Sequence, residues 1–169
     1  MRQLASHDLD LVLSNRPVQR QAEDNWHCRR IARQQVSLVG RPGGLRLSFP
    51  DDVAGMPLLL PGLQSEIRTA FDALCEHLGV QTNVVAEVDD MAMMRLLARD
   101  TNAIALLPSV VVRDELQSGM LQEHCVVPSL YENFYAITVE RRYPHPLVRP
   151  LLARTQEDIL AMGQSGPET

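Results

Sequence analysis

The sequence has 169 residues, 45% hydrophobic and 22% charged, which suffices for one domain or two small lobes with a core. This composition excludes disordered, collagen-like and coiled-coil chains, and no run approaches the roughly 20 apolar residues of a membrane span. The net charge is −5 and all 16 basic residues are scattered arginines, which argues against DNA binding by this chain itself. Because lysine is absent, Schiff-base and lysine general-base chemistry are excluded.

Cysteine usage and the first residues predict a cytoplasmic setting. Cys28, Cys75 and Cys125 are an odd number, far apart and without a CxxC pair, which favours a reducing compartment. The opening MRQLASHDLD lacks the basic and apolar regions of a signal peptide.

The first third of the chain predicts short strands. Residues 9–13 form a buried strand that ends before Pro17, since the residue before a proline avoids the helical conformation. Further extended segments are predicted at 26–35, 36–40 and 46–49, and Pro50 with two aspartates then breaks the chain.

The middle predicts alternating strands and helices. A strand at 56–60 precedes a helix that Ser65 caps and Gly79 ends, and that carries one apolar stripe: Ile67, Phe71, Leu74, Cys75 and Leu78. A strand at 83–88 leads to a second helix, capped by Asp89 and Asp90 and ended by Asn102, and then to a strand at 103–107. This order predicts parallel βαβ units.

The last third predicts a short helix at 108–116, extended segments at 120–127 and 134–139, and an amphipathic helix at 147–162. A chain break is predicted between Pro128 and Phe134, and residues 163–169 form a polar tail.

No motif predicts catalysis, a cofactor or a metal. The pairs His27–Cys28 and His124–Cys125 are neighbours on strands, so their side chains point to opposite faces and cannot meet one metal. The aspartate pairs, 51–52 and 89–90, lie where turns and helix caps favour Asp. The loops at the carboxyl ends of the strands are better candidates, because open α/β sheets bind ligands there against helix N-termini.

Four pieces of the chain are informative together: LASHDLDLVLS, MPLLLPG with its helix, EVDD with MAMMRLLARDTNAIALLPS, and FYAITVERRYPHPLVRPLL. In order and spacing they resemble the effector-binding region of LysR-type transcriptional regulators. The first resembles that family's G-x-L-D-x-A-I strand, the third its G-x-G-I-x-x-L-P segment, and the last its closing strand and C-terminal helix. VDDMAMM further resembles the subgroup that activates the sodium–proton antiporter gene.

The resemblance implies a periplasmic-binding-protein-like α/β fold with two Rossmann-like subdomains joined by two crossover strands. It places subdomain I at 1–52 and 134–169 and subdomain II at 53–133, with the inducer in the cleft between them. The effector contacts that carry over are Ser14, Asn15, Pro61, Gly62, Ser65, Val88, Asp89 and Asp90.

The chain departs from the family pattern in three ways. The winged helix–turn–helix with its linker helix is absent, and so are the first strand and helix of subdomain I, which predicts an incomplete cleft and an exposed sheet edge. Thr101 and Ala103 replace the paired glycines of the G-x-G-I segment. We therefore expect a fragment of a longer regulator, with a decayed gene as the alternative.

We predict a sensing module without enzyme activity. A small molecule or ion closes the cleft and reorients the DNA-binding domain of the intact protein, which the resemblance implies is a dimer or tetramer. The alternatives are a solute-binding protein of a transport system and an enzyme of the prephenate dehydratase or porphobilinogen deaminase folds. The first would be favoured by a secretion signal and disulfides, and the second needs a catalytic cluster in the cleft.

Overall fold

Two compact units make up the chain. The computed structural model describes residues 4, 6, 8–18, 26–43, 46–139, 141 and 145–153. Unit 1 comprises Met1–Arg33 with Asn133–Thr169, and unit 2 comprises Gln34–Glu132. Two long strands, β2 (Trp26–Gly40) and β6 (Gln122–Val139), each continue from one unit into the other. The α/β class and the two crossover strands are thereby confirmed, whereas the limits of the two functional subdomains stay a prediction.

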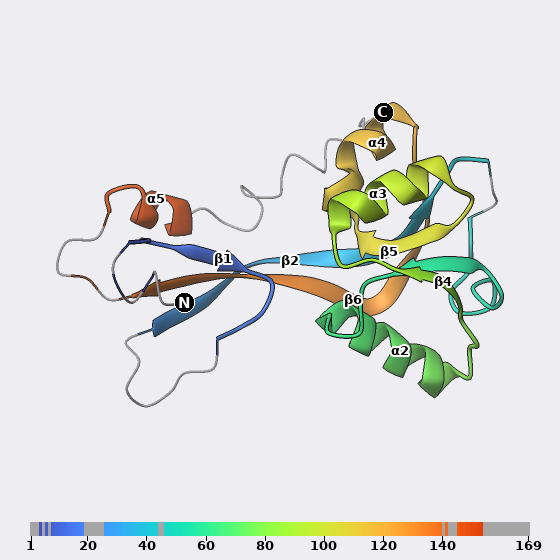
Figure 1. The fold of residues 1–169 in the computed structure, drawn as a ribbon, viewed down its shortest axis with the longest axis horizontal. Coiled ribbons are helices and arrows are strands. Elements are labelled where there is room, and N and C mark those ends of the chain that lie inside the picture. Colours follow the sequence, from blue (N-terminus) through green and yellow to red (C-terminus); the bar gives the residue numbers. More distant parts are fainter. Residues whose placement is uncertain are drawn as a thin grey trace, which may run out of the picture. The chain divides into compact units, whose positions relative to one another are not determined.

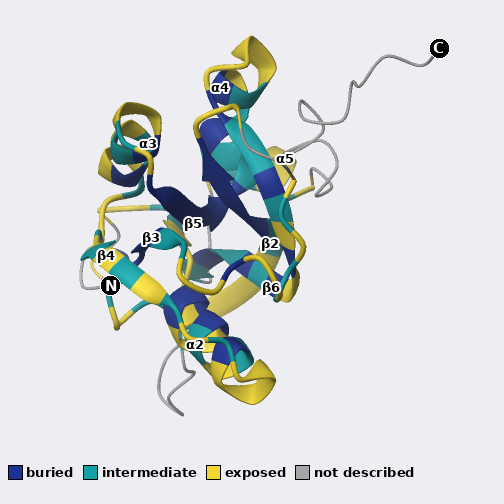
Figure 2. Cartoon of the chain, turned by 90° about the vertical axis from the view of Figure 1, so that its right-hand side faces the viewer, coloured by how far each residue is buried: buried dark blue, intermediate teal, exposed yellow. Residues whose placement is uncertain are grey.

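The strands of unit 2 include the predicted parallel βαβ units. β3 (Pro57–Leu60) pairs in parallel with β4 (Asn83–Glu87) and with β5 (Ile104–Pro108). β5 pairs antiparallel with β2, and the order of hydrogen-bonded strands along the sheet is β1-β6-β2-β5-β3-β4. β5 is buried along its whole length, as Figure 2 shows, and its five residues contribute to the centre of the unit.

Helices cover both faces of these strands. α2 (Glu66–Leu78) lies on one face, and α3 (Met91–Asp100), the 3-10 turn η1 (Ser109–Val112) and α4 (Arg113–Ser118) belong to the other (Figures 1 and 2). Because successive strand residues point to opposite faces, β3 contributes to two cores. Leu58 and Leu60 join the cluster of α2, which includes Phe71, and Leu59 joins the cluster of α3, which includes Met94.

Unit 1 contains β1 (Val12–Ser14), which pairs antiparallel with β6 in the register Val12 to Ile137 and Ser14 to Tyr135. It also contains α5 (Val148–Ala153), the described part of the helix predicted at 147–162. Residues 154–162 of that helix and the predicted tail at 163–169 lie outside the described residues. In the described part of the chain, no helix is both long and apolar enough to span a membrane.

Several predicted strand limits are wrong. Residues 26–35 and 36–40 are one strand, and the segments predicted at 120–127 and 134–139 are parts of the single 18-residue β6, which begins at Gln122. The break expected after Pro128 is instead one residue, Ser129, with a left-handed φ of 59° inside the strand. Residues 46–49 form no regular strand, although the Leu47 N–H donates to the His124 carbonyl at 2.9 Å.

The helix ends test three further predictions. Gly79 ends α2 in the left-handed conformation, as predicted. Asn102 does not end α3: the Thr101 hydroxyl donates to the Leu97 carbonyl at 2.7 Å and accepts from the Ala103 N–H at 3.1 Å, and so closes the helix without a left-handed residue. Leu78, assigned to the buried stripe, is 44% exposed because it lies in the last turn, beyond the core.

Candidate functional site

Two loops meet where β3 and β4 end. The Val88 N–H donates to the Leu60 carbonyl at 2.9 Å, which extends the parallel pairing past both strands. Beyond it, a Cβ at Gly62 would lie 2.2 Å from Oδ1 of Asp89, closer than real Cβ contacts allow. The missing side chain of Gly62 therefore lets the Asp89 carboxylate lie directly on the loop between β3 and α2. Of the predicted effector residues, this contact brings together Gly62 and Asp89, the latter being exposed.

The two helices that follow these loops begin differently. Asp90 caps α3, because its Oδ1 accepts a hydrogen bond from the Met93 N–H at 2.9 Å. Ser65 occupies the N-cap position of α2 but makes no side-chain capping bond, so its predicted capping role is wrong. Its backbone N–H instead donates to the Gly62 carbonyl at 2.9 Å, which tightens the turn. The first turn of α2 thus keeps N–H groups for another acceptor.

Arg68 joins the structural parts of this site. Its side chain is only 9% exposed, and Nε donates to Asp72 at 2.7 Å. Nη1 donates to the Glu87 carboxylate at 3.0 Å and to the Pro61 carbonyl at 3.1 Å. One guanidinium therefore connects α2, the end of β4 and the loop after β3. Burial lowers the pKa of Arg68, but the hydrogen bonds and charges of its two carboxylate partners outweigh burial and raise that pKa overall.

A second polar group lies at the carboxyl end of β5. The hydroxyls of Ser37 and Ser109 are 3.1 Å apart, and the Ser109 hydroxyl donates to Glu123 Oε2 at 2.7 Å. Ser37 is fully buried, so these hydrogen bonds satisfy a hydroxyl that would otherwise be unpaired inside the unit. The loops at the carboxyl ends of the strands were the predicted ligand-binding loops, and in the loop after β5 the serine is bonded within the protein.

Ser14 and Asn15, the other two predicted effector residues, belong to unit 1. The Ser14 hydroxyl accepts from the Arg16 N–H at 3.0 Å at the end of β1, and Asn15 is exposed. Their place in the effector site stays a prediction. Within the described ranges, no three His, Cys, Asp or Glu side chains gather to hold a metal ion.

A comparison with protein families identifies the family of this chain. The LysR substrate binding domain matches residues 1–159, almost the whole chain. The chain belongs to the LysR substrate binding domain family. This family is one of transcriptional regulators and not of enzymes, and the match leaves less support for a transport-type solute-binding protein.

Relatives and solved structures agree with this LysR assignment. The chain is 26% identical over 149 residues to the transcriptional activator protein NhaR of Escherichia coli and, equally, of Shigella flexneri. The match covers 88% of this chain but 50% of NhaR, so the chain spans about half the length of these relatives.

Solved structures of regulatory domains show the fold. That of MexT from Pseudomonas aeruginosa has a TM-score of 0.70 at 17% identity, covering 94% of this chain and 78% of that one. That of the HypT M206Q mutant from Salmonella typhimurium has a TM-score of 0.66 at 20% identity, covering 90% and 78%.

Sequence reasoning missed the residues that hold this LysR site together. Arg68 lies outside the predicted apolar stripe of its helix, and only its i,i+4 spacing to Asp72 signals a partner in the sequence. Glu87 is 19 residues from Arg68 and Glu123 is 14 from Ser109, so those contacts follow from the fold alone.

Proposed function

We propose that this LysR domain is the effector-sensing part of a longer transcriptional regulator. Its effector is a small molecule or ion bound by eight residues: Ser14, Asn15, Pro61, Gly62, Ser65, Val88, Asp89 and Asp90. The observation that carries the proposal is the seating of the Asp89 carboxylate on Gly62, which joins the loops after β3 and β4 into one polar surface.

The chemistry of these loops favours an effector with a donor or positive charge. Asp89 and Asp90 are both exposed, and one carboxylate oxygen of Asp90 already accepts the hydrogen bond that caps α3. The uncapped first turn of α2 offers N–H donors beside them. A simple anion would be repelled by the two carboxylates, whereas a hydrated cation or a hydroxyl-bearing molecule finds acceptors and donors together.

The signal would pass through the two crossover strands. Because β2 and β6 continue from one unit into the other, an effector that contacts residues of both units changes which relative orientation is favoured. In the intact regulator, which we take to be a cytoplasmic dimer or tetramer, this change reorients the DNA-binding domain. The resemblance of VDDMAMM to the subgroup that activates the sodium–proton antiporter gene extends the proposal to control of that gene, and makes Na⁺ the first ion to test.

Thermal unfolding of the chain tests the proposal. NaCl is titrated against KCl at equal ionic strength, followed by a panel of polar, hydroxyl-bearing small molecules at constant salt. A ligand at 100 times its Kd stabilises the folded state by about 2.7 kcal/mol, which raises the Tm of a domain of this size by roughly 5–10 °C.

Two variants assign the effect to the site. Asp89→Asn should abolish the rise in Tm, because it removes the carboxylate on Gly62. Asp114→Asn is the matched control: its carboxylate is 84% exposed on α4, and it should respond as the parent does. If no ligand raises the Tm, or if both variants respond alike, the proposed effector site is wrong.

A further inference from the structure

A cavity lies in unit 2, at the opposite end of the sheet from the loops after β3 and β4. Its volume is about 640 Å³, within the range of small-molecule sites. Met56 and Asn102, which line it, come just before β3 and β5, whereas Pro61 and Ser109 follow the same strands. The length of the strands therefore separates this cavity from the loops that we assign to the effector.

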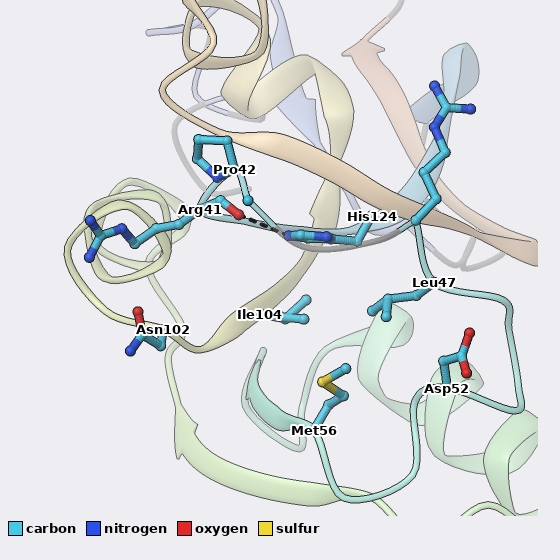
Figure 3. Close-up of a pocket in the computed structure, with 10 residues that line it drawn as sticks. Arg41, Pro42, Leu47, Asp52, Met56, Asn102, Ile104 and His124 are labelled. Atoms are coloured by element: carbon cyan, nitrogen blue, oxygen red, sulfur yellow. Dashed lines mark hydrogen bonds between the residues drawn. The ribbon is translucent and has the colours of Figure 1, made fainter.

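Charge and apolar surface are separated inside this cavity. Figure 3 shows Arg41 and Asn102 on one side, Asp52 on the opposite side, and three apolar side chains between them: Leu47, Met56 and Ile104. Oδ2 of Asp52 already accepts from the Ser48 N–H at 2.8 Å. A second arginine, Arg46, also lines the cavity, whose middle is apolar.

The Arg41 guanidinium is available to a ligand. It is exposed, and no carboxylate of a described residue lies within ion-pair distance of it. Its charge acts only at longer range, as a minor contribution to the lowered pKa of Asp100, whose main cause is the hydrogen bond from Arg99. An arginine beside an amide is a good partner for a carboxylate, since its fork of donors matches the two oxygens.

The wall around Arg41 is held in place by a buried histidine. His124 is 6% exposed, and its Nε2 lies 3.2 Å from the Arg41 carbonyl (Figure 3). Its own carbonyl accepts from the Leu47 N–H, so one residue fixes both sides of the cavity. A Cβ at Gly40 would lie 3.2 Å from Nε2, a tight contact that this glycine avoids.

We propose that this cavity is a second ligand site, for a small organic acid with an apolar body. The carboxylate binds Arg41 and Asn102, and the apolar part lies on Leu47, Met56 and Ile104. The ligand would contact the end of β2 through Arg41 and lie against β6 at His124, the two strands that continue into unit 1.

Amide NMR of the ¹⁵N-labelled chain tests this site residue by residue. Hexanoate and benzoate are titrated, with hexanamide as the neutral analogue of hexanoate. We expect saturable shifts of the Asn102 and Ile104 amides with the two monocarboxylates and none with hexanamide. Arg41→Gln should weaken binding about tenfold or more, since it removes a charge-assisted hydrogen bond. Arg113→Gln, in an exposed pair on α4, is the control and should bind as the parent does.

The same spectra define the results that overturn the proposal. It is wrong if neither monocarboxylate gives saturable shifts at Asn102 and Ile104, or if hexanamide binds equally well. It is also wrong if Arg41→Gln keeps the dispersed spectrum of the parent and binds with unchanged affinity. Shifts confined to Gly62 and Asp89 would assign the acid to the effector loops and refute a separate site.

Discussion

Arg68 gives the sharpest test of how the effector loops are held. Arg68→Met keeps an unbranched apolar stem of similar length but removes the guanidinium. The variant therefore loses three contacts at once, to Asp72, to Glu87 and to the Pro61 carbonyl, with little change in packing. We expect it to destabilise the folded chain and to loosen the loop between β3 and α2.

The structure sets the size of this loss. The side chains of Asp72 and Glu87 are 42% and 47% exposed, so water can replace the arginine, and each ion pair counts as a surface pair of about 0.5 kcal/mol. The Pro61 carbonyl loses a charged donor in a buried place, which costs about 1.5 kcal/mol or slightly more. The free energy of unfolding should fall by about 2–3 kcal/mol.

Urea unfolding, followed by circular dichroism, measures the change. The matched control is Arg99→Met, which removes an exposed arginine paired only with its neighbour Asp100, and should leave the stability unchanged. Glu87→Gln should cost less than Arg68→Met, because it leaves the bond to the Pro61 carbonyl in place. The reasoning is refuted if Arg68→Met and Arg99→Met unfold at the same urea concentration.

Three further predictions concern single groups. Asp90→Ala should cost about 1 kcal/mol in urea unfolding, because it removes the cap of α3, whereas Ser65→Ala should cost almost nothing because Ser65 makes no capping bond; equal losses would contradict this. Gly62→Ala should lower the free energy of unfolding by about 1 kcal/mol, because it displaces the Asp89 carboxylate. That loss should vanish in an Asp89→Ala background, and an undiminished loss would locate the clash elsewhere. Burial raises the pKa of Cys75 to about 11, with a smaller contribution from a nearby aspartate. Its neutral thiol therefore stabilises the fold at neutral pH, and this stability is lost as the pH rises from about 9 to about 11. The stability of Cys75→Ala should decline less steeply over that interval.

The sequence predicted unit 2 well because its elements are short and strongly patterned. α2 carries a clear apolar stripe between Ser65 and Gly79, and both ends are where the pattern placed them. β3 and β5 are buried apolar runs, as expected of parallel strands with helices on both faces. Local pattern and tertiary structure agree in these elements, so propensity alone finds them.

The long strands and the contacts of the site were harder to predict. Pro128 was interpreted as a break, yet β6 passes it with a single left-handed residue, Ser129. The buried contacts of Arg68 were not predicted, because a helical pattern cannot reveal that Glu87 and the Pro61 carbonyl lie beside it. Such contacts depend on where the fold brings distant segments, and no local rule reports that.

The two ends of the unit 2 sheet differ in which charges remain free. At the carboxyl ends of the strands the buried cation, Arg68, is occupied by two carboxylates, and Asp89 and Asp90 are exposed. At the other end, no carboxylate of a described residue lies within ion-pair distance of Arg41. An organic acid that stabilises this domain should therefore act through Arg41 and not through the loops after β3 and β4, whereas a cation should do the reverse. If both ligands bind, their effects on the Tm should add, because opposite ends of the strands hold them.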